Sequence, residues 1–231
     1  MNKCNYKKIL NYFSLCEWIL WISSLFVITV SFFLFDGENI LSFVASLLGS
    51  TALIFCAKGN PIGQILVIIF SILYAYISYT FTYYGEMITY LGMSCPMAIY
   101  ALISWIRNPY KGNHSEVKVN KITNKEIIFI VLLSFLVTWA FYYILKIFGT
   151  ANLIPSTLSV TTSFIAVFLT ARRSPLYAIA YAVNDIVLIV LWSFASLNDK
   201  SYVSVLVCFI IFLATDIYGY YNWRRMEKRQ K

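Results

Sequence analysis

Residues 175–197 read PLYAIAYAVNDIVLIVLWSFASL, and Asp185 is the one charged side chain in these 23 positions. A stretch of about 20 mostly apolar residues is long enough to cross the hydrocarbon core of a bilayer as an α-helix. The same character extends over the chain, because 60% of its 231 residues are hydrophobic and 12% are charged. A soluble domain carries about a quarter charged residues. The composition therefore predicts a membrane protein and excludes a soluble globule, a disordered chain and a disulfide-stapled secreted module.

Seven further apolar stretches of suitable length lie between charged or turn-forming clusters on either side of this segment. We expect transmembrane helices at about 15–35, 40–57, 62–82, 87–106, 126–148, 156–171, 175–197 and 201–222. The sixth is the shortest and most polar, which indicates either a broken helix or one that lines a cavity. The predicted fold is an all-α integral membrane protein with eight transmembrane helices.

Basic residues are distributed unevenly between the two sides of this arrangement. If the helices alternate, sixteen of the 18 Lys and Arg residues lie on one side, and Lys146 and Lys200 are the exceptions. The acidic residues expected on the opposite side are Asp36, Glu38, Glu86 and Asp199. The positive-inside rule then places both termini in the cytoplasm. The net charge of +8 is thus a topology signal and does not form a stripe that would bind nucleic acid.

The segments outside the spans are short. Residues 1–14 predict an amphipathic stretch at the cytoplasmic interface, 107–125 a cytoplasmic loop with the single histidine, and 224–231 a basic cytoplasmic tail. Glu17, near the cytoplasmic end of the first span, is expected to be interfacial and to reach water. The five cysteines have no paired spacing, so they indicate apolar filling rather than disulfides or a metal site.

An internal repeat is visible. Two segments have similar residue types in the same order: Phe55-Cys-Ala-Lys-Gly-Asn-Pro61 and Leu169-Thr-Ala-Arg-Arg-Ser-Pro175. Residues 40–106 and 152–223 then form two three-helix repeats, 126–148 is a linker helix that makes them parallel, and 15–35 is an extra first helix. The predicted layout is 1 + (3 + 1 + 3), which recurs among transporters whose substrate sites lie near mid-membrane. The alternative is a similarity that reflects shared membrane composition.

The seventh span carries the strongest candidate site. One helical face holds Tyr177, Tyr181, Asn184 and Asp185, with Trp192 one to two turns further on. An ionisable group inside a membrane faces a bundle interior or an aqueous cavity. Flat aromatic rings beside fixed polar groups suit a planar ring that carries a sugar. Asp216, inside the last span, is the second candidate acid, and the alternative for the two acids is a hydrogen-bonded pair that packs helices.

Further candidates come from the third and eighth spans. They are Gln64, Ser71, Tyr74 and Ser78 on one side of the third span, and Tyr220 after Asp216 on the eighth. Ser71 aligns with Asp185 when the two repeats are superposed without gaps. Asn222 is close enough to the membrane boundary to be an ordinary interfacial residue.

Enzyme signatures are missing from the sequence. There is no HExxH, GxSxG, Gly-rich phosphate loop or paired CxxC. The contexts Val-Asn-Asp185 and Ala-Thr-Asp216 differ from the Gly-rich and Tyr-Asp motifs of intramembrane aspartic proteases. We therefore expect no enzymatic activity, no metal and no cofactor.

The run from Pro175 to Asp185, the 3 + 1 + 3 repeat and the ending YGYYNWRR at 218–225 resemble the PnuC family of nicotinamide riboside transporters over nearly the whole chain. Members typically carry two aromatics, usually Trp, one turn apart, and an Asn or Asp one turn later. Tyr177, Tyr181 and Asp185 match that spacing. The resemblance implies a SWEET-like homotrimer in the bacterial inner membrane. It also implies facilitated uptake of a nucleoside-like solute, which a cytoplasmic kinase traps by phosphorylation.

Tyrosine stands at both aromatic positions, and its hydroxyl can hydrogen-bond a different base edge than Trp would. The identity of the ring that the site binds is therefore not fixed by the resemblance. Nicotinamide riboside is the first expectation, and 2′-deoxynucleosides, thiamine and riboflavin are the alternatives. Two other classes also fit: a membrane substrate-binding subunit of an ATP-driven importer, and a structural or signalling membrane protein without a ligand. The expected partners are a small-molecule substrate and the lipid bilayer.

Overall fold

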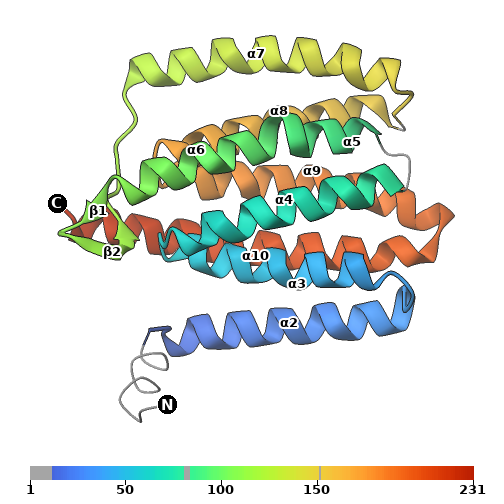
Figure 1. Cartoon of the computed structure of the whole chain (residues 1–231), viewed down its shortest axis with the longest axis horizontal. Helices are drawn as coiled ribbons and strands as arrows, with labels where there is room; N and C mark the ends of the chain where they lie inside the picture. The colour runs from blue at the N-terminus through green and yellow to red at the C-terminus, as the bar shows by residue number, and fades with distance from the viewer. Residues whose placement is uncertain (1–11, 81–83, 151) are drawn as a thin grey trace.

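The structure is a computed structural model that describes residues 12–80, 84–150 and 152–231. Its long helices run side by side along one direction, with a small hairpin at one end (Figure 1). The elements are α2 (Leu15–Phe35), α3 (Ile40–Ala57), α4 (Ile62–Thr80), α5 (Tyr84–Thr89), the π-helical η1 (Tyr90–Ser94), α6 (Cys95–Ile106), β1 (Pro109–Tyr110), β2 (Asn113–Val117), α7 (Asn124–Ile147), α8 (Leu153–Ala171), α9 (Leu176–Asn198), the 3₁₀ turn η2 (Lys200–Tyr202) and α10 (Val203–Arg229). Within the described ranges, eight helical spans are long and apolar enough to cross a membrane, which confirms the predicted fold class.

Local sequence signals explain where two of the helices begin. Ser14 caps α2 and Thr123 caps α7, each through a capping box completed by a glutamate three residues later. In this arrangement the cap hydroxyl accepts a bond from the helix backbone, and the glutamate accepts one from the cap backbone. These caps set the ends of α2 and α7 that lie nearest the hairpin (Figure 1).

The helices form two triplets, α3–α4–α6 and α8–α9–α10, which begin at the same end of the bundle (Figure 1). The first helix of each triplet packs on the third helix of the other, α3 on α10 and α8 on α6. Helix α7 connects the two triplets in sequence and packs along the outer side of α8. Helix α2 lies against α3 and α10. Two parallel repeats would give this reciprocal packing. The repeat itself, and the division of the chain into segments that it implies, stay predictions.

The two turns within the triplets have the same backbone path. Gly59 and Arg173, at equivalent places in the related segments 55–61 and 169–175, both adopt a positive φ, of 67° and 57°. The residue that follows each of them, Asn60 or Ser174, accepts a bond from the backbone N–H two positions on. A positive φ is strained for arginine. At Arg173 the surrounding hydrogen bonds hold that conformation in place.

The hairpin strand β2 and the residues after it join these two turns. The backbone N–H of Val117 donates to the Gly59 carbonyl at 2.9 Å, and that of Asn120 donates to the Arg173 carbonyl at 2.9 Å. The Gln230 side chain, just after α10, accepts from the Val119 N–H and donates to the Val117 carbonyl. The segment predicted as a loop at 107–125 is therefore an ordered strap across one end of the bundle.

Two of the spans differ from the prediction in whether the helix is interrupted. The fourth span contains the π-helical turn η1, whereas the sixth is an unbroken helix, so the expectation of a break there is wrong. Hydroxyls in α8 bond back to carbonyls of their own helix, for example Thr157 to Leu153 and Thr161 to Thr157, and this satisfies the polar side chains without a break. The cavity-lining alternative for this span is confirmed, because Ser163 and Thr170 line a central cavity.

The ends of the chain also differ. Helix α10 continues to Arg229, so the predicted basic tail at 224–231 is mostly helical, and the Arg224–Glu227 ion pair supports this last part. Helix α4 is described as far as Thr80, and the last two residues of the span predicted at 62–82 lie outside the described residues. Most of the amphipathic segment predicted at 1–14 lies outside the described residues.

Glu17 is buried, with 2% of its surface exposed, so its prediction as a water-accessible interfacial residue is wrong. Lys58 Nζ donates to both of its carboxylate oxygens at 3.1 and 2.9 Å, and the Tyr218 hydroxyl donates to Oε1 at 2.9 Å. The cause is tertiary: the α3–α4 turn and α10 cover the beginning of α2. These bonds attach the extra first helix to the rest of the bundle.

Candidate functional site

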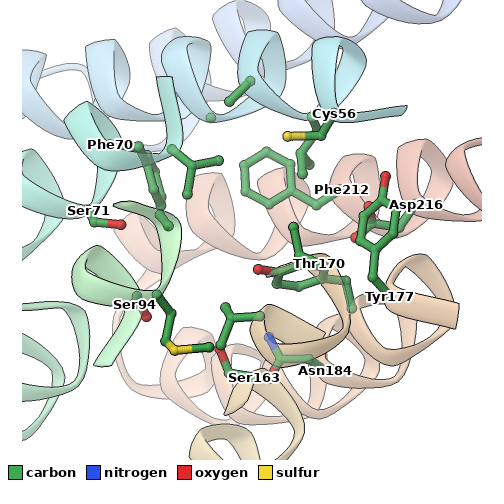
Figure 2. Close-up of a pocket in the computed structure, with 18 of the residues that line it drawn as sticks. Cys56, Phe70, Ser71, Ser94, Ser163, Thr170, Tyr177, Asn184, Phe212 and Asp216 are labelled. Carbon is green, nitrogen blue, oxygen red and sulfur yellow. The ribbon is translucent and has the colours of Figure 1, made fainter. Parts of the chain in front are cut away.

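A cavity of about 110 Å³ lies between the two triplets, and Figure 2 shows labelled side chains from both of them around one space. Phe70 on α4 and Phe212 on α10 form part of its apolar wall. The polar or titratable side chains that line it are Cys56, Gln64, Ser71, Tyr90, Ser94, Ser163, Thr170, Tyr177, Tyr181, Asn184, Asp185 and Asp216. A mostly apolar cavity with a few convergent polar groups is typical of a small-molecule site.

Two carboxyl groups meet at this cavity. Asp185 on α9 and Asp216 on α10 are each 4% exposed, and both line this cavity. Two buried carboxyl groups at one site do not readily ionise together, because burial and like-charge repulsion both oppose it, so the pair can carry a single negative charge. Asp185 Oδ2 is buried and has no partner among the described residues. An unsatisfied buried acceptor is costly, so this oxygen favours a role in binding a solute over a pair that only packs helices.

Two phenol rings precede Asp185 on α9, Tyr181 by one helical turn and Tyr177 by two. Tyr177 and Tyr181 are edge to face, with ring centroids 6.1 Å apart, and both line the cavity. Tyr177 is 2% exposed and lies edge to face with Trp223 at 4.9 Å. The α-helical period explains the arrangement, since residues four apart share one face. The face of α9 predicted from the sequence therefore does point into the cavity over Tyr177, Tyr181, Asn184 and Asp185.

The neighbouring helices supply fixed polar groups. The Thr162 hydroxyl on α8 donates to Asn184 Oδ1 at 2.8 Å and so orients that amide. Gln64 on α4 donates its amide N–H to Cys56 Sγ at 3.3 Å. Ser71, 1% exposed, has a buried hydroxyl without a partner among the described residues. An unpaired hydroxyl and an unpaired carboxylate oxygen in one cavity give it both a donor and an acceptor for a solute.

Four predicted site residues lie outside this cavity: Tyr74, Ser78, Trp192 and Tyr220, of which Ser78 lines a neighbouring cavity. Trp192 is seven residues beyond Asp185, and Tyr74 is three beyond Ser71, so they line neighbouring cavities nearer the other end of the bundle. Tyr220 packs on the buried cluster around Trp105 and Trp223 and lies 5.7 Å from the Arg224 guanidinium. For Trp192 and Tyr74, sequence periodicity gave a face that lines a cavity but not the position along the helix axis, whereas Tyr220 lines none of the three cavities.

Other lining residues were missed. The π-helical turn brings Tyr90 and Ser94 to the cavity, and nothing in the sequence around Gly92 indicates a π turn. Ser163 and Thr170 on α8 are seven residues apart, and this spacing could have identified them. Cys56, interpreted as an apolar filler, lines the cavity and accepts the Gln64 hydrogen bond.

The arrangement suits binding rather than bond cleavage. It offers stacking surfaces, a carboxyl pair, and amide and hydroxyl groups that can fix a polar solute. Of the described lining residues, none is Lys, Arg or His. A cationic ring would therefore meet an opposite charge here, whereas a phosphate would meet no positive one.

The sequence model of the nicotinamide mononucleotide transporter family matches residues 39–225. The chain belongs to the PnuC family of membrane transporters. It is 28% identical over 215 residues to the nicotinamide riboside transporter PnuC of Neisseria mucosa, which covers 91% of this chain and 81% of that protein.

A solved structure gives the same assignment. The fold matches the crystal structure of the vitamin B3 transporter PnuC with a TM-score of 0.84 and 25% identity over all of both chains. This PnuC family member is thus a multi-pass membrane transporter and not an enzyme.

Proposed function

We propose that this chain mediates facilitated diffusion of nicotinamide riboside, a precursor of NAD, across the bacterial inner membrane. The observation that carries the proposal is the unpartnered Asp185 Oδ2 in a cavity with the rings of Tyr177 and Tyr181. Nicotinamide riboside has a cationic pyridinium ring, which would lie near the carboxyl pair and against the phenol faces. Its carboxamide and ribose hydroxyls would use Asn184 and Ser71.

The charge of the lining supports the riboside over the mononucleotide that the family description mentions. The mononucleotide carries a phosphate, and buried phosphate is normally held by Arg, Lys or a helix N-terminus. No basic side chain is among the described residues that line the cavity. The riboside brings one positive charge into a site that can carry one negative charge.

The distribution of charge supports an orientation with the hairpin end inside the cell. Lys58, Arg107, Arg172 and Arg173 lie at the hairpin end, together with the last turns of α10, and the positive-inside rule places that end in the cytoplasm. Phosphorylation by a cytoplasmic kinase would then keep the imported riboside inside the cell. The concentration gradient of the riboside alone would drive uptake, which agrees with a sequence that has no nucleotide-binding motif.

A ligand panel on the purified chain tests the proposal. Calorimetry would compare nicotinamide riboside, nicotinamide mononucleotide, thiamine, riboflavin, and ribo- and 2′-deoxynucleosides. We expect nicotinamide riboside to bind most tightly. Tighter binding of an uncharged nucleoside would show that Tyr177 and Tyr181 mark a different specificity, and no binding across the panel would overturn the transport proposal.

Reconstitution of the chain alone separates it from a subunit of an ATP-driven importer. We expect transport of nicotinamide riboside into vesicles that contain no other protein and no ATP. A chain that binds the solute but does not move it under these conditions would be an importer subunit.

A further inference from the structure

Two further cavities continue from the central one toward the end of the bundle opposite the hairpin. An intermediate cavity of about 50 Å³ shares Tyr90, Ser94 and Asn184 with the central cavity. It shares Tyr74, Glu86 and Trp192 with an outer cavity of about 390 Å³. The central and outer cavities also share Phe70 and Phe212, so the three adjoin one another. We name the outer one the vestibule.

The vestibule is lined by acidic side chains from three separate parts of the chain. They are Asp36 and Glu38 after α2, Glu86 in α5, and Asp199 after α9. None of its described lining residues is basic. Lys200 follows Asp199 and is exposed but does not line the space. Charges of one sign around a cleft focus the field and raise the local concentration of the opposite ion.

An aromatic wall with a free donor marks the place where a solute would bind in the vestibule. The rings of Trp192 and Tyr202 have centroids 5.4 Å apart, and both residues line the vestibule. Trp192 is 8% exposed, and its buried Nε1–H has no acceptor in the part of the chain that the structure describes. A buried indole N–H normally has a partner. Here a carbonyl or hydroxyl of a solute can supply it.

We propose that the vestibule is a second, outer binding site that selects cationic nucleosides before they reach the central cavity. Its carboxylates attract the positive ring, the Trp192 and Tyr202 faces hold it by cation–π contact, and the indole N–H bonds an oxygen of the solute. Neutral nucleosides lack the first two attractions, and anionic ones are repelled. The identity of the nucleoside rests on the proposed function, whereas the selection by charge does not.

Glu38 and Asp199 are the most suitable residues for a test. Glu38 is exposed and Asp199 accepts a bond from the Ser201 backbone N–H, which an asparagine oxygen can also do. The double variant Glu38→Gln, Asp199→Asn removes two charges and keeps side-chain shape. Glu227→Gln, on the last turns of α10 at the hairpin end, removes one acidic charge far from the vestibule and is the matched control.

The first measurement is initial uptake of nicotinamide riboside and of its reduced form, which is uncharged but nearly the same in shape, into intact cells. In the double variant we expect KM for the cation to rise about three- to tenfold at low ionic strength, with the maximal rate unchanged. KM for the reduced form should stay the same. Trp192→Phe, which keeps a ring but loses the donor, should raise KM for both forms. Equal KM changes for the two forms in the double variant would overturn selection by charge.

The second measurement does not depend on the substrate. Ser42, at the start of α3, lines the vestibule. The rates at which a cationic and an anionic methanethiosulfonate modify Ser42→Cys report the local potential, and the chain without this cysteine gives the background. We expect the ratio of cationic to anionic rates to fall severalfold in the double variant and to stay constant in Glu227→Gln. An unchanged ratio would overturn the proposal. If wild-type cells take up neither form of the riboside, the proposed function fails. The ratio of the cationic to the anionic modification rate at Ser42→Cys then still decides whether the vestibule selects by charge.

Discussion

The rings of Trp105 on α6 and Trp223 on α10 have centroids 5.4 Å apart. Each indole donates a hydrogen bond to the helix triplet that contains the other indole. Trp105 Nε1 donates to the Thr170 carbonyl and Trp223 Nε1 donates to the Cys56 carbonyl, both at 2.9 Å. The two acceptors are equivalent positions in the related segments 55–61 and 169–175. Both indoles are fully buried, and both acceptor residues line the central cavity. The crossed bonds therefore join the two triplets directly behind the candidate site.

Removing one of these donors should weaken the bundle. Trp223→Phe keeps an aromatic ring but leaves the Cys56 carbonyl without its side-chain donor, so we expect a loss of about 1–2 kcal/mol in the free energy of unfolding. Thermal unfolding in detergent measures the loss. Trp139→Phe on the exposed face of α7 is the control and should change little. Equal stability of Trp223→Phe and wild type would contradict a joining role for the crossed bonds.

Tyr181 should contribute to binding through its ring more than through its hydroxyl. Stacking on a base is worth about 1–3 kcal/mol, so Tyr181→Ala should weaken nicotinamide riboside binding about 5- to 150-fold. Tyr181→Phe should stay within about threefold of wild type. Calorimetry measures both, with the exposed Tyr221→Ala as control. A larger loss in Tyr181→Phe than in Tyr181→Ala would mean that stacking is not the interaction.

Gly63 allows α4 to approach α3 closely. A Cβ there would lie 2.6 Å from the Cys56 backbone nitrogen and 3.0 Å from the Ala52 carbonyl oxygen. We expect Gly63→Ala to cost about 1–3 kcal/mol in the free energy of unfolding, because backbone atoms must move apart. Gly219→Ala is the matched control, since its Cβ would meet its nearest atoms at 3.5 Å. If thermal unfolding shows the two variants to be alike, the close approach of α3 and α4 is not as described.

The Glu17–Lys58 pair should show strong coupling. The Glu17 side chain is 3% exposed and that of Lys58 is 19% exposed, so Lys58→Met leaves a nearly buried carboxylate with Tyr218 as its remaining side-chain donor. We expect this single variant to lose about 2 kcal/mol and the double variant Glu17→Gln, Lys58→Met to recover more than half of that loss. Thermal unfolding of the full cycle measures the coupling. Additive losses would show that the two side chains act independently.

Hydropathy was sufficient to find the membrane spans, because lipid requires a long apolar helix wherever the chain crosses. Helical periodicity was sufficient for the inner face of α9, where Tyr177, Tyr181 and Asp185 share one side. Trp192 shows the limit of that signal. It lies two turns further along the same helix and faces a different cavity.

The features that the sequence did not indicate depend on contacts between distant segments. Glu17 is buried because Lys58 and Tyr218, far away in sequence, close over it. The strap formed by residues 107–125 is ordered because N–H groups within residues 117–120 donate to the carbonyls of Gly59 and Arg173. The repeat layout, the homotrimer, the cytoplasmic location of the termini and the kinase coupling stay predictions.

Counterflow of labelled nicotinamide riboside is the most direct test of transport through the central cavity. Vesicles that contain the purified chain and unlabelled riboside, without ATP or an ion gradient, are placed in labelled riboside. We expect wild type to accumulate label transiently and Asp185→Ala to accumulate none while it remains folded. The absence of counterflow in wild type, or wild-type counterflow in Asp185→Ala, would contradict the proposal.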